Sequence, residues 1–408
     1  MFSKASKQRL KHSTFYSTFK EGVSMSNLFP TYNKWPITVK EAHGTTLTDD
    51  NGKRYLDFVA GIAVCNLGHC HPHVNQAIKN QLDKVLHVSN LFHIEGQDDV
   101  ANQLVSNSSG DLVFFCNSGT EANEAAIKLV RKATNKKKII TFYQSFHGRT
   151  MGSLSATGQD KIHQGFGPLL EGFTYVPFND CDALKAVVDH EVAAIILEVI
   201  QGEGGVHEVT SEFIKTINML KEKHKLLVVV DEVQTGIGRT GKAFGYQHYN
   251  LSPDIITVAK GLGNGFPVGG LIGKQHLIEA FGPGSHGSTF GGNPLAMAAA
   301  TATTETIFTE EFLNDVLDKG NYIFSKLKNA IQSSIVKQVR GKGLMIGIEC
   351  HQEVSSFISS LRDDGLLVLN AGPNVIRLLP PLTVSYKEID QAVELIASVL
   401  NKVTVNSN

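Results

Sequence analysis

Two short apolar runs near the middle of the chain each end on a residue that could do chemistry. Residues 226–230 and 255–259 are rich in β-branched side chains, are too short for typical helices and are flanked by turn residues, so both are predicted to be buried strands. Asp231 follows the first run and Lys260 follows the second. Ligands of α/β proteins bind at the carboxyl ends of strands. An amine and a carboxylate at one rim are the two groups that a pyridoxal phosphate site requires, but for these two residues alone a structural ion pair at the sheet edge is the preferred interpretation.

A turn before a predicted helix is a second candidate for ligand binding. Ser118, Gly119 and Thr120 follow the apolar run 112–115 and open a helix that is expected to end near Lys132. Ser118 and Thr120 are good N-cap residues, and Gly119 lets a ligand approach the backbone closely. The free N–H groups of the first turn could then bind a phosphate. An ordinary capped helix would show the same pattern.

Two other motifs are interpreted as incidental. Residues 236–242 (GIGRTGK) nearly match a P-loop, but Ala243 stands where a hydroxyl should reach the magnesium ion, and the segment does not directly follow a strand. Residues 68–73 (GHCHPH) contain imidazole and thiol groups that zinc prefers, but no second cluster completes four ligands. We therefore predict no metal site, and we expect GHCHPH to be a packed loop near the rim of the sheet.

The elements that would hold these residues follow an α/β pattern. Short apolar runs alternate with helical patterns, which predicts a mostly parallel sheet with crossover helices. The predicted strands of this sheet are residues 112–115, 139–142, 193–197, 226–230 and 255–259. Because crossover connections place the carboxyl ends of parallel strands at one rim, we expect Asp231 and Lys260 to lie on the same side of the sheet.

Both ends of the chain are predicted to form a second, smaller α+β domain. Asp50-Asn51-Gly52 supplies the turn of a hairpin within residues 45–58, an amphipathic helix covers 311–332, and strands are expected at 343–349 and 375–379. The predicted division of the chain is a tail at residues 1–27, the N-terminal part of the small domain at 28–65, a large cofactor-binding domain at 66–300 and the C-terminal part of the small domain at 301–408.

Composition excludes several classes of partner. The 408 residues are 42% hydrophobic, which allows a large core, and the formal net charge of −1 gives no preference for nucleic acid or an anionic membrane. No apolar run approaches the length of a membrane span. The five cysteines form no CxxC pair, which is typical of a reducing compartment.

The first 25 residues are basic, rich in Ser and Thr, and contain no acid before Glu21. This composition resembles a mitochondrial transit peptide, but the amphipathic pattern is weak, and a disordered tail ahead of Met25 is the preferred interpretation. We therefore expect a cytoplasmic protein, with the mitochondrial matrix as the alternative.

Six motifs occur in the order found in class III, fold-type I aminotransferases, which use pyridoxal phosphate. They are SGTEANEAA at 118–126, FHGRT at 146–150, QGEGG at 201–205, DEVQTGIGRTG at 231–241, PDIITVAKGLGNGFPVGG at 253–270 and HGSTFGGNP at 286–294. The resemblance covers nearly everything after Leu28, and within the class it is strongest to bacterial acetylornithine aminotransferases. It implies an α/β fold, with a mostly parallel seven-stranded sheet in the large domain and a smaller α+β domain.

The resemblance also implies which residues bind the cofactor. Lys260 would bond the pyridoxal phosphate and, once released by the substrate amine, would act as the base that moves a proton. Asp231 would hold the ring nitrogen protonated. The other expected contacts are Ser118, Gly119 and Thr120 at the phosphate, Phe146 and Val233 on the two ring faces, Gln234 at the phenolic oxygen, and Thr289 contributed by the second subunit of a homodimer with shared active sites.

Four further residues would bind the small-molecule substrates. Arg149 matches the family arginine that grips a carboxylate through its guanidinium fork, and Arg377 matches a second arginine for the α-carboxylate of glutamate. Glu203 is expected to pair with Arg377 while the other substrate is bound, and Ser288 would lie near the acyl end of that substrate. Surface or interdomain ion pairs are the alternative for both arginines.

The implied reaction moves the δ-amino group of N2-acetyl-L-ornithine to 2-oxoglutarate, giving N-acetyl-L-glutamate 5-semialdehyde and L-glutamate in arginine biosynthesis. Ornithine aminotransferases carry a tyrosine at the position of Ile62, and an aliphatic residue there fits an acylated α-nitrogen or 4-aminobutyrate better. Ornithine, 4-aminobutyrate and succinylornithine aminotransferases are the alternatives within the class. A ligand-binding regulator on the same fold is the non-enzyme alternative, against which Lys260, Asp231 and Arg149 together argue.

Overall fold

The computed structural model describes residues 27–402, which belong to two units, one up to Thr38 and one from Val39 onward. Residues 27–38 contain no helix or strand and are mostly exposed. The tail and transit-peptide interpretations concern residues 1–25, which lie outside the described residues. The division into domains at 28–65, 66–300 and 301–408 stays a prediction.

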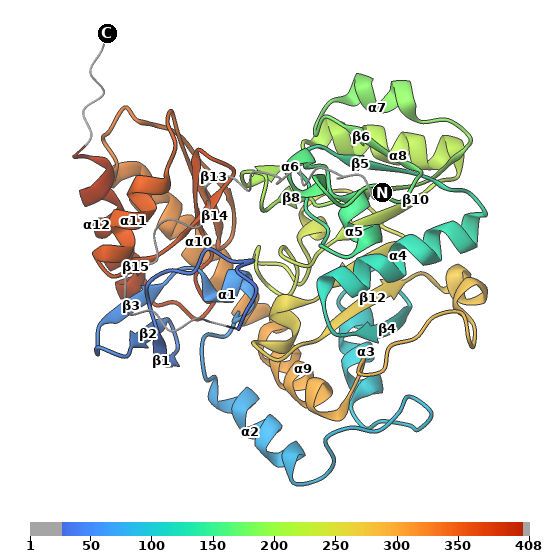
Figure 1. Cartoon of the computed structure of the whole chain (residues 1–408), viewed down its shortest axis with the longest axis horizontal. Coiled ribbons are helices and arrows are strands. Elements are labelled where there is room, and N and C mark those ends of the chain that lie inside the picture. The colour runs from blue at the N-terminus through green and yellow to red at the C-terminus, as the bar shows by residue number, and fades with distance from the viewer. Residues whose placement is uncertain (1–26, 403–408) are drawn as a thin grey trace, which may run out of the picture. The chain divides into compact units, whose positions relative to one another are not determined.

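The unit that starts at Val39 contains a seven-stranded sheet (Figure 1), with strand order β4-β12-β11-β10-β7-β5-β6. Its strands are β4 (Leu112–Cys116), β5 (Lys138–Phe142), β6 (Phe173–Val176), β7 (Val192–Leu197), β10 (Leu227–Asp231), β11 (Ile255–Val258) and β12 (Gly269–Gly273). Only β12 runs antiparallel to its neighbours β4 and β11, so the predicted mostly parallel sheet is confirmed. The five predicted strands differ from the observed ones by no more than one residue at either end.

Two strands of this sheet were not predicted, and β12 shows why. Its sequence, GGLIG, contains three glycines and little of the β-branched content that marks a strand. At Gly269, a Cβ atom would lie 2.6 Å from the carbonyl oxygen of Ser118, so only glycine lets β12 pass beside the turn that opens α4. The glycines that hide the strand in the sequence therefore allow it to support the candidate phosphate turn.

Helices connect and cover the strands. Between residues 60 and 307 they are α1 (Ala60–Ala63), α2 (Pro72–Leu82), α3 (Gln97–Ser106), α4 (Gly119–Thr134), α5 (Met151–Ala156), α6 (Asp160–His163), α7 (Cys181–Val187), α8 (Ser211–His224) and α9 (Pro294–Ile307). Short 3-10 turns are η1 (Gly245–His248), η2 (Lys260–Gly263) and η3 (Gln275–Phe281), and β8 (Ile200–Gln201) pairs with β9 (His207–Glu208).

Helix α4 illustrates how the sequence fixes an element at the candidate site. Ser118 caps its first turn by accepting a hydrogen bond from the backbone N–H of Glu121 at 3.3 Å, and Asn135 ends the helix in the left-handed conformation. The buried face of α4, which includes Ala125, Ala126 and Leu129, packs on β11 and β12. This packing places the start of the helix at the rim where β10 and β11 end.

Two smaller sheets complete this unit, and the first of them joins N-terminal strands to a C-terminal strand. β1 (Val39–His43), β2 (Thr46–Asp49) and β3 (Arg54–Asp57) form an antiparallel sheet that β15 (Leu366–Leu367) completes by pairing parallel to β3. β13 (Val336–Lys342), β14 (Met345–Cys350), β17 (Val375–Leu378) and β16 (Leu369–Ala371) form the other, accompanied by α10 (Glu310–Ala330), α11 (Ser355–Asp363) and α12 (Tyr386–Leu400). The predicted hairpin, long helix and two C-terminal strands are therefore confirmed.

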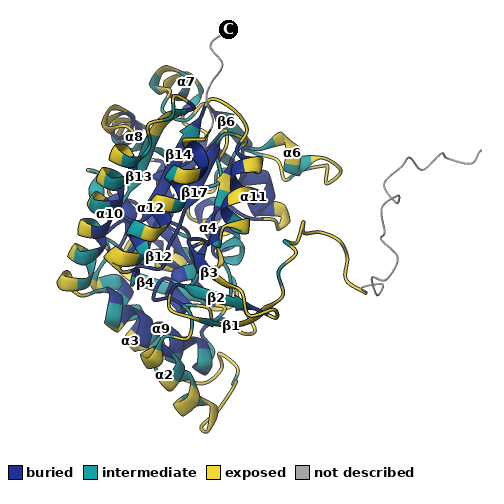
Figure 2. Ribbon diagram, turned by 90° about the vertical axis from the view of Figure 1, so that its left-hand side faces the viewer, coloured by how far each residue is buried: buried dark blue, intermediate teal, exposed yellow. Residues whose placement is uncertain are grey.

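Burial follows the layers of this unit, since the strands are mostly buried while the helices expose their outer faces (Figure 2). Within residues 27–402, no helix combines the length and the apolar character needed to span a membrane.

Candidate active site

A cavity of about 430 Å³ lies at the carboxyl ends of the central strands. It is the size expected for a small-molecule site. Every residue predicted for cofactor or substrate binding lines it except Ser288, Thr289 and Arg377. The fold therefore brings together side chains that come from strand ends, loops and a helix start far apart in the sequence.

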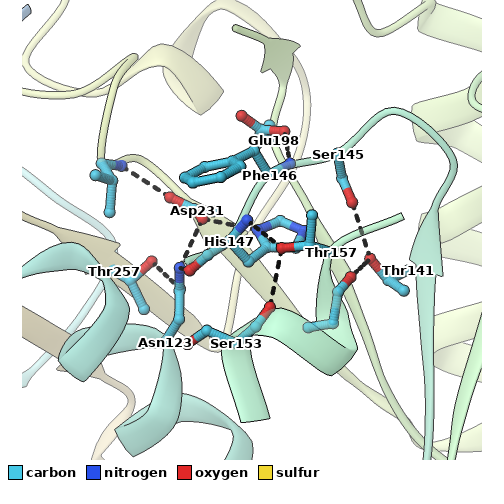
Figure 3. A network of polar contacts seen from close by, with 12 residues as sticks. Asn123, Thr141, Ser145, Phe146, His147, Ser153, Thr157, Glu198, Asp231 and Thr257 are labelled. Atoms are coloured by element: carbon cyan, nitrogen blue, oxygen red, sulfur yellow. Dashed lines mark hydrogen bonds and ion pairs between the residues drawn. The ribbon is translucent and has the colours of Figure 1, made fainter. Parts of the chain in front are cut away.

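Asp231 ends β10 and is almost completely buried, and both oxygens of its carboxylate accept hydrogen bonds (Figure 3). Oδ2 accepts hydrogen bonds from His147 Nδ1 at 2.7 Å and Asn123 Nδ2 at 2.8 Å, while Oδ1 accepts one from the N–H of Val233 at 3.0 Å. Among the described residues, the ion-pair partner of Asp231 is thus His147 and not Lys260. Burial would lower the pKa of His147, but the hydrogen bond and charge of Asp231 outweigh burial and raise it.

Lys260 begins η2 directly after β11 and has a positive φ of 44°, which is uncommon for a residue with a side chain. Burial lowers the pKa of Lys260, and the nearby carboxylates of Glu203 and Asp231 only partly offset this effect. A lowered pKa increases the fraction of neutral amine, which is the form that attacks a carbonyl or accepts a proton.

The start of α4 leaves room for a ligand and none for a larger side chain. A Cβ atom on Gly119 would lie 2.7 Å from Val233 Cγ1, so the cavity wall fits only glycine here. The first N–H groups of a helix have no intrahelical partner, and they carry partial positive charge. Thr120 adds a hydroxyl, which shares a hydrogen bond of 2.8 Å with the hydroxyl of Thr150.

Two arginines flank the cavity in different environments. Arg149 is exposed, its guanidinium lies 5.6 Å from the ring centre of Phe146, and no carboxylate of the described residues forms an ion pair with it. Arg377 is only 2% exposed, and its Nη1 contacts Glu203 Oε1 at 2.9 Å and Gln234 Oε1 at 3.2 Å. Burial raises the pKa of Glu203, but the charge and hydrogen bond of Arg377 outweigh burial and lower it.

The residues that do not line the cavity have clear positions. Arg377 lies behind Glu203 and Gln234. The Ser288 hydroxyl accepts a hydrogen bond at 3.1 Å from the side chain of Asn117, which does line the cavity, and Thr289 is exposed. Ile62, on which the choice of donor depends, is absent from the cavity wall, which instead contains Val64.

Three residues of the site were not identified from the sequence, namely Asn123, His147 and Glu198. Glu198 is buried, lines the cavity, and accepts a hydrogen bond from the N–H of Phe146 at 3.1 Å. Burial raises the pKa of Glu198 to about 7. Asn123 and His147 stand within the motifs SGTEANEAA and FHGRT, but their contact with Asp231 depends on tertiary packing, which no local pattern reports.

The two motifs that the sequence analysis set aside have structural contacts. The buried guanidinium of Arg239, in GIGRTG, donates hydrogen bonds to Leu344 O at 3.1 Å, to Pro380 O at 2.5 Å and to Asn66 Oδ1 at 2.7 Å. In GHCHPH, His69 Nε2 contacts Asp57 Oδ2 at 2.7 Å, and the hydrogen bond with Asp57 raises the pKa of His69 to about 10.

The family described as aminotransferase class-III matches residues 29–400. The chain belongs to the class-III aminotransferases. Its sequence is 60% identical over 370 residues to the acetylornithine aminotransferase of Bacillus subtilis (strain 168), covering 90% of this chain and 96% of that protein. The family match therefore includes the strands at residues 39–57 and 336–378 as well as the central sheet.

Solved structures of class-III enzymes share the fold. The ornithine aminotransferase of Toxoplasma gondii ME49 matches with a TM-score of 0.88 and 29% identity, covering 92% of this chain and 93% of that one. The N-acetylornithine aminotransferase of Stenotrophomonas maltophilia K279a matches with a TM-score of 0.80 and 33% identity, covering 91% and 97%. The fold is therefore that of the fold-type I aminotransferases.

Proposed function

We propose that this aminotransferase moves the δ-amino group of N2-acetyl-L-ornithine to 2-oxoglutarate, giving N-acetyl-L-glutamate 5-semialdehyde and L-glutamate, as a step of arginine biosynthesis. The observation that carries the proposal is one cavity that Lys260, Asp231 and Arg149 line together, with a second arginine, Arg377, paired to the lining residue Glu203. The 60% identity to the acetylornithine aminotransferase of Bacillus subtilis (strain 168), over 96% of that protein, supports this choice of substrate.

We propose pyridoxal phosphate as the cofactor. When bound, it would supply the electron sink that stabilises a carbanion at the substrate carbon. Gly119 and Thr120, the first residues of α4, line the cavity, so the free N–H groups of the first turn are placed to bind its phosphate. Oδ1 of Asp231 has a single N–H partner and lies in a residue that lines the cavity, which suits it to hold the ring nitrogen.

The remaining roles follow from burial and chemistry. Phe146 and Val233 offer apolar contact to the two ring faces, and Gln234 offers an amide to the phenolic oxygen. Lys260 would hold the cofactor through Nζ. Its lowered pKa favours the neutral amine, which would suit Nζ to accept a proton from the substrate carbon.

The two arginines explain how one cavity serves two substrates. Arg149 has no carboxylate partner among the described residues, so it is available to the α-carboxylate of acetylornithine. Arg377 is neutralised by Glu203 until glutamate or 2-oxoglutarate brings a second carboxylate. The substrates then react in turn, with ping-pong kinetics.

We propose that the enzyme works as a homodimer. Large apolar side chains are exposed at the end of α2, on the segment after it and on a neighbouring loop, namely Leu82, Val85, Leu86, Leu91, Phe92 and Phe290. The two segments are adjacent, since the rings of His87 and Phe290 lie 5.0 Å apart and Asn90 donates a hydrogen bond to Ser288 O at 3.2 Å. Clustered exposed apolar side chains are typical of an interface, and this one adjoins Thr289, which would contact the cofactor of the second subunit.

Steady-state rates on one preparation test the substrate. We expect kcat/KM to be highest with N2-acetylornithine among acetylornithine, succinylornithine, ornithine and 4-aminobutyrate. A clear preference for free ornithine would contradict the proposal.

The five free cysteines fit a cytoplasmic location, which we also propose.

The cofactor and the role of Lys260 have separate tests. The purified protein, or the protein after addition of pyridoxal phosphate, should show a visible absorption band, and the lack of any band would overturn the assignment. The variant Lys260→Ala should bind the cofactor without turnover. Sedimentation of the active enzyme should give a dimer, and an active monomer would count against a shared site.

A further inference from the structure

Asn123 lies in the second turn of α4, is 3% exposed, and uses both ends of its side-chain amide (Figure 3). Nδ2 donates hydrogen bonds to Asp231 Oδ2 at 2.8 Å and to the carbonyl oxygen of His147 at 2.7 Å. Oδ1 accepts a hydrogen bond from the hydroxyl of Thr257 at 2.8 Å. Because Thr257 and the His147 carbonyl fix which end of the amide is the donor, Asn123 can present only an N–H to Asp231.

The two oxygens of Asp231 are therefore not equivalent. Oδ2 receives two side-chain donors, from Asn123 and from His147, whereas Oδ1 receives only the N–H of Val233. A carboxylate oxygen accepts about two hydrogen bonds, so Oδ1 is the oxygen with capacity for one more partner. Rotation of the carboxylate would break the contacts with Asn123 and His147.

We propose that Asn123, held in place by Thr257, is a positioning residue that orients the carboxylate of Asp231 toward the ring nitrogen of pyridoxal phosphate. The inference rests on the proposed function, since it assumes that this cofactor occupies the cavity. A donor to Oδ2 also stabilises the ionised form of the carboxylate, which is the form that attracts a protonated ring nitrogen. The site is thus built from four elements, since α4, the loop after β5, β10 and β11 each contribute one member.

A purely structural role for Asn123 predicts something different. If the amide only ties α4 to β11, its loss would weaken the binding of any ligand of the cavity by a similar factor. If it orients Asp231, its loss would weaken mainly those ligands that carry a ring nitrogen. A pair of cofactors that differ only at this atom separates the two roles.

The experiment compares dissociation constants of the apoprotein for pyridoxal phosphate and for its carbocyclic analogue, in which a C–H replaces the ring nitrogen. Both compounds carry the aldehyde and the phosphate, so their ratio isolates the contact with Asp231. We expect the ratio of the two dissociation constants, which measures the preference for pyridoxal phosphate, to fall about tenfold in Asn123→Ala, a factor typical of one hydrogen bond to a charged group. In Thr257→Val it should fall about threefold, because Asn123 keeps its contact with Asp231 but loses the hydroxyl that holds its amide in place.

Thr141→Val is the matched control. Thr141 is as buried as Thr257, and its hydroxyl donates a hydrogen bond to the carbonyl oxygen of Ala156 at 2.7 Å, with no contact to Asp231 (Figure 3). The same removal of a buried hydroxyl should leave the preference unchanged. Because Thr257 acts through Asn123, adding Thr257→Val to Asn123→Ala should change the preference no further.

Several outcomes would overturn the assignment. An unchanged preference in Thr257→Val, an equal loss in Thr141→Val, or equal weakening of both cofactors would assign Asn123 a structural role only. Since Thr257→Val conserves shape, it tests the proposal even if Asn123→Ala folds poorly. If the wild type binds neither compound, the proposed function fails and this inference fails with it. If the wild type prefers pyridoxal phosphate and the variants keep that preference, only this inference fails.

Discussion

Replacing Glu203 by glutamine should make the enzyme bind 2-oxoglutarate more tightly. Glu203 Oε1 lies 2.9 Å from Arg377 Nη1, so it occupies the guanidinium that the second carboxylate of 2-oxoglutarate must reach. The substrate has to displace Glu203 before it can bind. Glu203→Gln removes the competing charge but keeps an oxygen that can accept a hydrogen bond from Arg377.

The magnitude follows from the geometry of the pair. Two unit charges about 4 Å apart attract each other by about 4 kcal/mol at an effective dielectric constant of about 20. The Arg377 side chain is 2% exposed, but that of Glu203 is 34% exposed. Hydration of the displaced Glu203 carboxylate therefore offsets much of the attraction that is lost when it leaves Arg377. A net competition of about 1.4 kcal/mol remains, which corresponds to a roughly tenfold decrease in KM for 2-oxoglutarate. KM for acetylornithine should not fall, because that substrate does not displace Glu203.

Initial rates over a matrix of both substrates would give the two KM values, and Glu208→Gln provides the matched control. Glu208 pairs with Lys342 at 3.0 Å outside the cavity, and its side-chain exposure of 31% is close to that of Glu203. The control should leave both KM values unchanged. An unchanged or higher KM for 2-oxoglutarate in Glu203→Gln, or a parallel shift of both KM values, would refute the reasoning.

Three further predictions test the cavity wall and two buried ionisable groups. Gly119→Ala should weaken pyridoxal phosphate binding by about tenfold or more, because the added methyl group would clash with Val233 in the cavity wall. Gly282→Ala is the control, since its Cβ would meet only one atom, at 3.9 Å, and this variant should bind the cofactor normally in the same titration. His69→Asn should lower the free energy of unfolding by about 1–3 kcal/mol near pH 7. Asp57 raises the pKa of His69 from 6.5 to about 10. The stability difference between the wild type and His69→Asn should therefore be largest below pH 6.5 and disappear as the pH rises through about 10, as urea unfolding at several pH values can measure. Burial raises the pKa of Glu198 from 4.5 to about 7. Because the buried carboxyl group must ionise as the pH rises from 4.5 to about 7, the wild type should lose stability relative to Glu198→Gln over this range. A stability difference that does not change with pH in urea unfolding would contradict the raised pKa.

The central strands could be predicted because parallel strands buried on both faces are continuous apolar runs. Residues 226–230 and 255–259 carry that signal, and they correspond to β10 and β11 within one residue. β12 could not be predicted, because its sequence is rich in glycine, and Gly269 is required by the close approach of Ser118, which lies more than a hundred residues away in the sequence. The missed strand reflects a tertiary constraint that local composition does not contain.

The site divides in the same way. Lys260 and Asp231 could be identified as candidates because they stand at strand ends, where ligands bind, but a structural ion pair explained the two residues alone, and only the six motifs favoured a cofactor site. Asn123 stands in the second turn of a helix that would form with many residues at that position. Arg239 resembles part of a nucleotide-binding loop until its hydrogen-bond partners are known. Residues that act through a neighbour leave no signal in the spacing of the sequence.

The contacts of Asp231 and Lys260 also decide between the two explanations of an acid and an amine at one rim. A structural ion pair requires that each group satisfy the other, but both oxygens of Asp231 already accept hydrogen bonds from Asn123, His147 and Val233. Burial lowers the pKa of Lys260, and the carboxylates of Glu203 and Asp231 offset this effect only in part. A carboxylate held by donors beside an amine shifted toward its neutral form is a poor salt bridge. The same arrangement suits two ends of one bound ring, since the acid must attract a proton at the nitrogen while the amine must lose one to react.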